Sequence, residues 1–242
     1  MAAANTVSDA HSVLRRLQWG GALWALGVVQ FVVGMLVTQA LYGPPTYSVT
    51  GNYISDLGAV HCMYWGGEGA FFGDYVCSPA HNVFNISIIL LGILLILGIF
   101  LLYPAIPKPV GRWVALGIFI IAGVGSSLVG VFPEDVNLPV HIAVATTAFA
   151  GVNIGLFVFA ALFWRDVRWG SGWGVYSLLS GIVGLLALVL FLERTYGPLG
   201  VGGMERLIVA PTLVWALLVG ISLMRRPRLA ESGRGGAPAP SA

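Results

Sequence analysis

Side chains that could take part in chemistry lie in a few short stretches of this sequence, separated by long apolar runs. They include carboxylates, histidines and amides, which can bind metal ions, transfer protons or hydrogen-bond a ligand. The primary candidates for a polar site are Asn52, Ser55, Asp56, Asn82, Asn85, His141 and Glu205. The secondary candidates are His81, Glu134, Asp135 and Glu193.

Three interpretations of these residues stay open. In the first they are structural, with Asn, Ser and Asp side chains bonding backbone groups of a turn and Glu193 and Glu205 pairing with Arg194 or Arg206. In the second they bind or transport a lipid or hydrophobic small molecule. In the third they belong to an intramembrane enzyme that acts on lipid head groups through a metal-bound or base-activated water. The sequence has no HExxH motif, so the catalytic residues are unknown and no metal or cofactor is expected.

The elements that must position these residues are membrane-spanning helices. Of the 242 residues, 57% are hydrophobic and 9% are charged, and the mean hydropathy is +0.88, which excludes a soluble globular domain. A helix needs about 20 apolar residues to cross a bilayer, and uninterrupted runs of that length are typical of helices rather than β-barrel strands. Six runs qualify: 17–41, 82–103, 113–132, 140–164, 173–192 and 204–224.

The basic residues predict how these spans are oriented. Ten of the 12 lysines and arginines fall before the first span, in the even-numbered connections or after the sixth. The positive-inside rule therefore places both termini in the cytoplasm of a multi-pass protein of the cell membrane. Polar groups at membrane depth cost free energy unless they are paired, so the candidates at the outer helix ends indicate a polar pocket there. The net charge of +2 gives no reason to expect nucleic acid.

The chain divides into a cytoplasmic segment over 1–16, a six-helix domain over 17–226 and a disordered cytoplasmic tail over 227–242. The external connection over 42–81 holds the two cysteines of the chain, Cys62 and Cys77, which an oxidising compartment would allow to form a disulfide. The alternative is a pair of free thiols. Aromatic residues between the cysteines predict that this loop lies on the membrane interface or caps the bundle.

Four motifs resemble a known family. They are NYISDLG at 52–58, SPAHNVFN at 78–85, the GVFPED passage at 130–135 with its following histidine, and GMERL at 203–207. In this order they resemble the domain-of-unknown-function family 998, over about 18–226. The resemblance implies a prokaryotic membrane protein of six to seven helices without an established activity. The first motif is also similar to a run in the Frag/DRAM/Sfk membrane proteins. The stretch after Ala59 departs from the family pattern, so His61 and Glu68 inherit nothing from it.

The sequence therefore predicts an all-α, polytopic membrane protein with six helices in an antiparallel bundle. Its expected partners are membrane lipids, and its oligomeric state is left open. We expect Asp56, His141 and Glu205 to approach one another at the outer face.

Overall fold

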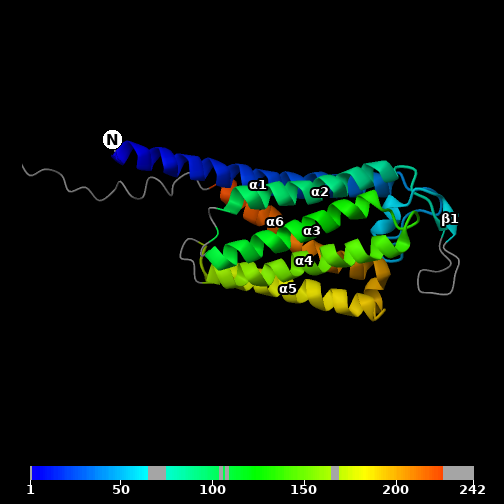
Figure 1. Ribbon diagram of the computed structural model, residues 1–242. Helices are drawn as coiled ribbons and strands as arrows, with labels where there is room; N and C mark the ends of the chain where they lie inside the picture. The colour runs from blue at the N-terminus through cyan, green and yellow to red at the C-terminus, as the bar shows by residue number, and fades with distance from the viewer. Residues whose placement is uncertain (1, 65–74, 104–105, 107–108, 165–168, 226–242) are drawn as a thin grey trace, which may run out of the picture.

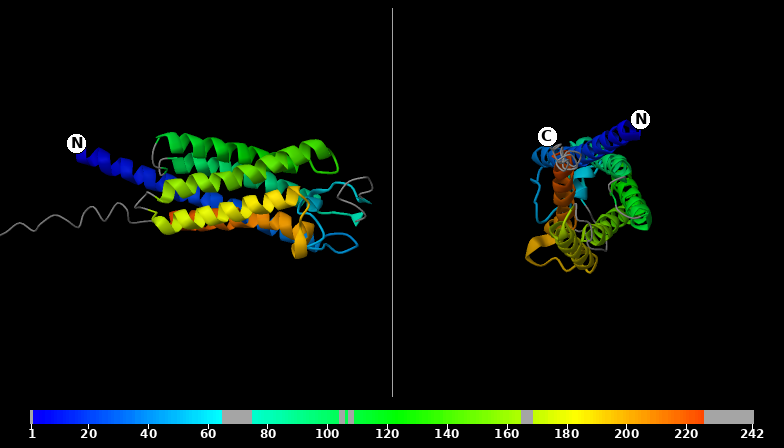
Figure 2. Two further views of the ribbon diagram at one scale, coloured as in Figure 1. Left: turned by 90° about the horizontal axis from the view of Figure 1, so that it is seen from below. Right: turned by 90° about the vertical axis from the view of Figure 1, so that its left-hand side faces the viewer.

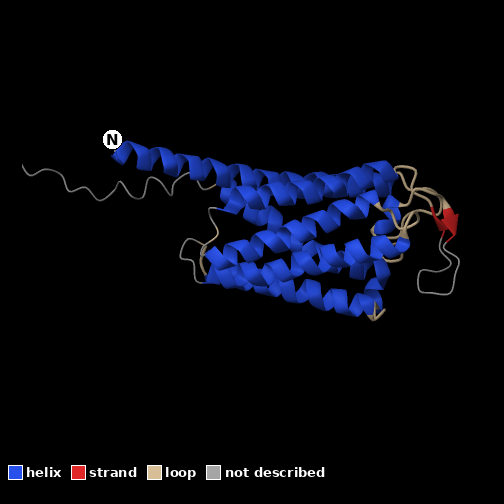
Figure 3. Cartoon of the chain, in the orientation of Figure 1, coloured by secondary structure: helices blue, strands red, loops and turns tan. Residues whose placement is uncertain are grey.

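The computed structural model describes residues 2–64, 75–103, 106, 109–164 and 169–225. This part of the chain contains six helices long and apolar enough to cross a membrane, which confirms the predicted all-α, multi-pass fold (Figure 3). They are α1 (Ala2–Ala40), α2 (His81–Leu102), α3 (Pro109–Val131), α4 (Leu138–Trp164), α5 (Ser171–Leu192) and α6 (Gly200–Met224). Most bounds lie within a few residues of the expected spans. The exception is α1, which continues to Ala2 through the segment expected to precede the membrane domain. The predicted tail over 227–242 lies outside the described residues.

The six helices form a closed ring. Each helix packs against the next along the chain, and α6 packs against α1. The end view shows this arrangement directly (Figure 2). Short connections favour antiparallel neighbours, so all odd-numbered helices run in one direction. We call the end of the ring that carries residues 41–64, 75–80, 132–137 and 193–199 the loop end.

Small residues and a few polar side chains hold neighbouring helices together. Gly92 of α2 lies against Gly123 and Ser127 of α3, where an added Cβ would collide with the Gly123 carbonyl oxygen. Gln30 Nε2 donates to the Ser87 carbonyl at 2.9 Å. Asn153 Nδ2 donates to the Ile208 carbonyl at 3.1 Å. Within the membrane-spanning segments, these amides therefore join α1 to α2 and α4 to α6.

Aromatic side chains fill the ring away from the loop end. Trp24, Phe119, Phe159 and Trp215 come from four helices, and the rings of Phe159 and Trp215 lie 4.9 Å apart. Both indole N–H groups have acceptors, because Trp24 Nε1 donates to the Leu95 carbonyl at 3.1 Å and Trp215 Nε1 donates to Ser177 Oγ at 2.8 Å. A buried indole normally needs such a partner. All four side chains of this cluster are buried.

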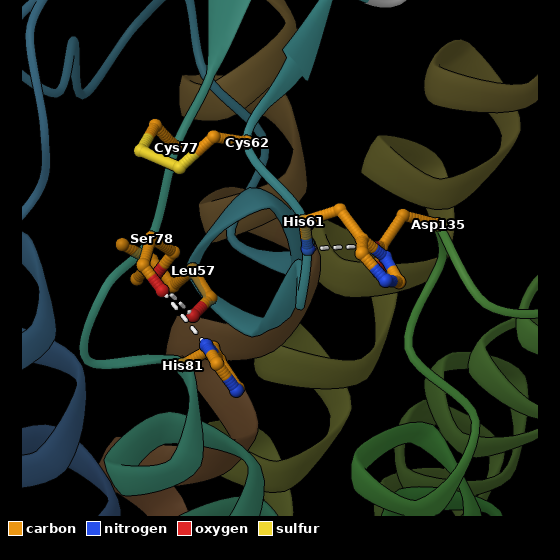
Figure 4. Close-up of a disulfide and its surroundings, with 7 residues drawn as sticks. All are labelled: Leu57, His61, Cys62, Cys77, Ser78, His81 and Asp135. Carbon is orange, nitrogen blue, oxygen red and sulfur yellow. Dashed lines mark hydrogen bonds and ion pairs between the residues drawn. A yellow bond between two sulfur atoms is a disulfide. The ribbon is translucent and has the colours of Figure 1, made fainter.

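The connection from α1 to α2 folds into the mouth of the ring at the loop end (Figure 1). It contains a short 3-10 helix, η1 (Ser55–Gly58), and the antiparallel strands β1 (Met63–Tyr64) and β2 (Tyr75–Val76). A disulfide joins Cys62 to Cys77 beside these strands (Figure 4), as the sequence predicted. Most of the aromatic stretch between the cysteines lies outside the described residues.

Candidate functional site

The site is built around the segment 52–58, which we call the η1 loop. Asp56 is 3% exposed and its Oδ2 accepts hydrogen bonds from Asn52 Nδ2 at 2.8 Å and from the Tyr53 backbone N–H at 3.0 Å. The Ser48 N–H donates in turn to Asn52 Oδ1 at 2.9 Å. Asn and Asp side chains stabilise turns in this way. Here the Asn52 side chain and the Tyr53 N–H hold the Asp56 carboxylate in a buried position.

Glu205 fixes the η1 loop from the opposite side. It lies near the start of α6, is 5% exposed, and accepts a hydrogen bond from the Ile54 backbone N–H. The α6 backbone can approach this closely because Gly202 faces the loop, where an added Cβ would collide with the Asn52 carbonyl oxygen.

Arg206 does not pair with Glu205, in contrast to one interpretation of the sequence. Its Nη1 donates to the carbonyls of Val49 at 3.0 Å and Gly202 at 2.9 Å, and its Nη2 donates to the Tyr47 hydroxyl at 2.6 Å. The guanidinium thus joins the start of α6 to residues 47–49, just before the η1 loop, through neutral acceptors. Burial raises the pKa of the Tyr47 phenol, although Arg206 acts in the opposite direction.

Glu134 enters the same region from the α3–α4 connection. It is 6% exposed, and its carboxyl interacts with the side chains of Asp56 and Ser55. Burial raises the pKa of Glu134 well above its ordinary value, and the neighbouring Asp56 carboxylate raises it further. Its Oε1 is buried with no hydrogen-bond partner among the described residues.

His141 joins this group from the first turns of α4. Its Nδ1 lies 2.8 Å from the Phe132 carbonyl oxygen, to which it donates. In a neutral imidazole this arrangement leaves Nε2 as an acceptor. The ring is positioned by the start of the helix, where Asn137 Oδ1 accepts from the Val140 N–H at 3.2 Å.

Two adjoining cavities meet at these polar groups. The first, which we call the core cavity, lies inside the ring and has an empty volume of about 760 Å³, its open mouth included. Its walls are mostly apolar, and Ser55, His141 and Glu205 line its polar end. Apolar wall residues include Phe31, Phe84, Leu91, Leu95, Ala148 and Val152.

The second cavity, which we call the side cavity, lies between α4 and α5 where the two helices diverge toward the loop end (Figure 1). It has an empty volume of about 880 Å³, counted in the same way. Glu134 and Arg194 line it, and it shares Ser55, His141, Ala145, Phe149 and Glu205 with the core cavity.

The remaining candidates are placed differently. Asn85 Nδ2 donates to the Gly58 carbonyl at 2.9 Å, so it supports the η1 loop from α2. His81 Nδ1 lies 2.9 Å from the Ser78 carbonyl oxygen (Figure 4). Asn82 and Glu193 are exposed and do not join the cluster.

The secondary candidate Asp135 contacts His61, a pairing that the sequence reasoning did not predict. His61 Nδ1 lies 2.9 Å from Asp135 Oδ2, and the His61 backbone N–H donates to the same oxygen at 2.8 Å (Figure 4). This contact ties the α1–α2 connection to the α3–α4 connection. The two residues are 74 positions apart, and no periodicity or motif relates them.

Within the described ranges, no group of three or more His, Cys, Asp or Glu side chains has an arrangement that could hold a metal ion. The cluster is therefore best described as buried carboxyls and an imidazole facing two cavities. Such an arrangement can accept hydrogen bonds or exchange protons.

The six spans and their loop-end cluster define a multi-pass helical membrane protein. The chain belongs to the family described as Protein of unknown function (DUF998), whose model matches residues 25–222. This confirms the resemblance inferred from the four motifs. The more distant likeness to Frag/DRAM/Sfk proteins stays a prediction. No curated protein and no solved structure matches the chain.

Proposed function

We propose that this protein binds an amphipathic, lipid-like molecule in its two adjoining cavities. The observation that carries the proposal is the separation of apolar and polar side chains around the core cavity. Apolar side chains from several helices surround one end, and Ser55, His141 and Glu205 line the other. An alkyl chain gains free energy on entering apolar walls, and a head group can use the polar groups at the loop end.

The side cavity offers a route for such a ligand. It lies in the wall of the ring between α4 and α5, so a lipid-like molecule could enter from the membrane without passing through water. We propose further that the loop end faces the outside of the cell and that both termini are cytoplasmic. The basic residues at the opposite end of the spans support this orientation.

Native mass spectrometry of protein released from membranes tests the proposal. We expect wild-type protein to carry a bound amphiphile. Ala145 lines both cavities, so Ala145→Phe should fill the shared space and remove the adduct. Ala143 is exposed on the same helix, and Ala143→Phe should retain it. Equal adducts in the two variants, or none in wild-type protein, would contradict binding in the cavities.

A second candidate function is an enzyme that acts on lipid head groups. The contact between the Asp56 and Glu134 carboxyls favours it, because two carboxyls held together can act as a general acid–base pair. Such an enzyme would convert an added lipid into a product that mass spectrometry detects, and Asp56→Asn would stop the conversion. Binding without product by wild-type protein favours the first candidate.

A further inference from the structure

His141 presents an unused hydrogen-bond acceptor to the two cavities. The residue is 7% exposed and lines both the core cavity and the side cavity. Its ring forms no ion pair among the described residues and is therefore neutral, because a buried cation without a partner is costly. Nδ1 carries the ring hydrogen, since the Phe132 carbonyl oxygen can only accept. The lone pair of Nε2 is left without a donor from the described chain.

This Nε2 atom is also open to the cavities. The fully buried polar atoms that lack a partner in the described part of the chain include Glu134 Oε1 and Asp135 Oδ1, but not His141 Nε2. Nε2 therefore has accessible surface, although the residue as a whole is buried. Because the residue lines both cavities, this surface faces the space that a ligand would occupy.

Glu205 adds a second open acceptor from the start of α6. It is 5% exposed and also lines both cavities. One carboxyl oxygen, Oε2, accepts a hydrogen bond from the Ile54 N–H. The other, Oε1, has no hydrogen bond to a described residue and, like His141 Nε2, is not fully buried. Two helices thus direct one open acceptor each to the same polar end.

The described residues supply no donor for these two acceptors. The guanidinium of Arg206, next to Glu205 in the chain, bonds two backbone carbonyls and the Tyr47 hydroxyl. Arg194 is exposed and lines the side cavity but not the core cavity. Polar atoms at buried sites of native proteins are almost always satisfied. A molecule that occupies the cavities therefore has to bring an O–H or N–H donor.

We propose that the head group of the ligand is an uncharged hydroxyl, so that the cavities take long-chain alcohols or neutral lipids with a free hydroxyl. This inference rests on the proposed function. The ligand O–H donates to His141 Nε2, and its chain lies against Ala145 and Phe149, which line both cavities. These three residues follow one another at intervals of four along α4, so they share one face of the helix.

A charged head group fits this end of the cavities less well. An anion would bring further acceptors to a site that already presents only acceptors, and it would be repelled by the Glu205 carboxylate. An ammonium would have to leave water for a buried site, at a cost that pairing with a buried carboxylate often fails to repay. A hydroxyl supplies the missing donor with a smaller loss of hydration.

The test compares two fluorescent alkyl probes of equal chain length, one ending in a hydroxyl and one in the corresponding methyl ether, which cannot donate. Binding to full-length protein in lipid nanodiscs is measured by fluorescence anisotropy, with the signal from empty nanodiscs subtracted. Wild-type protein should bind the alcohol about tenfold more tightly, because the ether leaves the His141 acceptor unsatisfied. A third probe, ending in a primary ammonium, should bind no more tightly than the alcohol.

His141→Asn removes the acceptor and keeps the contact that positions the ring. Its side-chain amide can donate to the Phe132 carbonyl in place of Nδ1 but does not extend to the position of Nε2. The affinity for the alcohol should fall toward that for the ether, with ether binding unchanged. His81→Asn is the matched control, because His81 Nδ1 also lies 2.9 Å from a backbone carbonyl oxygen, that of Ser78 (Figure 4), and His81 lines neither cavity. It should keep the wild-type preference.

Equal affinities of wild-type protein for the alcohol and the ether, or tighter binding of the ammonium, would overturn the hydroxyl proposal and leave the proposed function standing. If none of the probes binds, the hydroxyl proposal fails. If mass spectrometry then also finds no amphiphile, the proposed function fails with it. The wild-type comparison needs no variant, so it decides the matter even if His141→Asn does not fold.

Discussion

The carboxylate of Glu205 accepts a hydrogen bond from the backbone N–H of Ile54, 151 positions earlier in the chain. This contact joins the start of α6 to the η1 loop, which in turn presents Asp56. The polar end of the cavities is therefore assembled by a bond between the first connection and the last helix. A substitution at Glu205 should therefore destabilise the whole η1 loop.

Replacing Glu205 tests this relationship. In Glu205→Ala the buried Ile54 N–H loses its acceptor, and we expect the free energy of unfolding to fall by about 1.5–3 kcal/mol. Glu205→Gln keeps a side-chain oxygen as acceptor and should lose less. Thermal unfolding of both variants in one detergent measures the difference. An equal loss in the two would show that the hydrogen bond does not hold the loop.

The disulfide gives a second prediction. Cys62 and Cys77 are 15 positions apart, and closing a loop of this length stabilises a fold by about 3 kcal/mol. The double variant Cys62→Ser, Cys77→Ser should unfold at a lower temperature and lose the mobility shift between reducing and non-reducing gels. Wild-type protein that shows no such shift would contradict a bridge in the cell.

The pKa of Glu134 predicts a pH dependence of stability. Burial and Asp56 raise this pKa above its ordinary value of 4.5, so the folded protein binds the proton more tightly than the unfolded chain. Stability should then fall as the pH rises from about 4.5 through the raised pKa. Glu134→Gln should flatten this fall, whereas Glu193→Gln should not. The measurement is the unfolding temperature as a function of pH. The same pH dependence in wild type and in Glu134→Gln would refute the raised pKa of Glu134.

The proposed orientation can be measured by labelling. Thr195 lies at the loop end and Ser12 near the start of α1, at the opposite end. In intact cells a membrane-impermeant maleimide should modify Thr195→Cys but not Ser12→Cys, because the loop end is proposed to face outside. The reverse pattern would place the cavities' polar end on the cytoplasmic side.

The fold could be predicted from the sequence because each membrane-spanning helix is indicated by a continuous run of apolar residues. Runs of about 20 apolar residues have few alternatives to a membrane-spanning helix, and the six helices lie where these runs do. The helix α1 begins before the predicted span, at Ala2, because a polar, alanine-containing segment carries no membrane signal yet can continue a helix.

The site was predictable in part. Asp56, His141 and Glu205 stood out because they are ionisable residues close to apolar spans. Glu134 was ranked below them, although its burial beside Asp56 makes it central. Hydropathy does not show which side of a turn faces the interior of the bundle. For the same reason the sequence analysis placed Asn82, which is exposed, among the site candidates. The side cavity depends on how α4 and α5 diverge, and no residue pattern encodes that angle.

The most direct test of the account is a structure of the wild-type protein determined by electron cryomicroscopy in lipid nanodiscs. We predict elongated density in the cavities, with its polar end at His141 and Glu205 and its chain directed toward Ala148 and Val152. Cavities that contain only water, or that side chains have closed, would contradict the claim that this protein holds an amphipathic ligand.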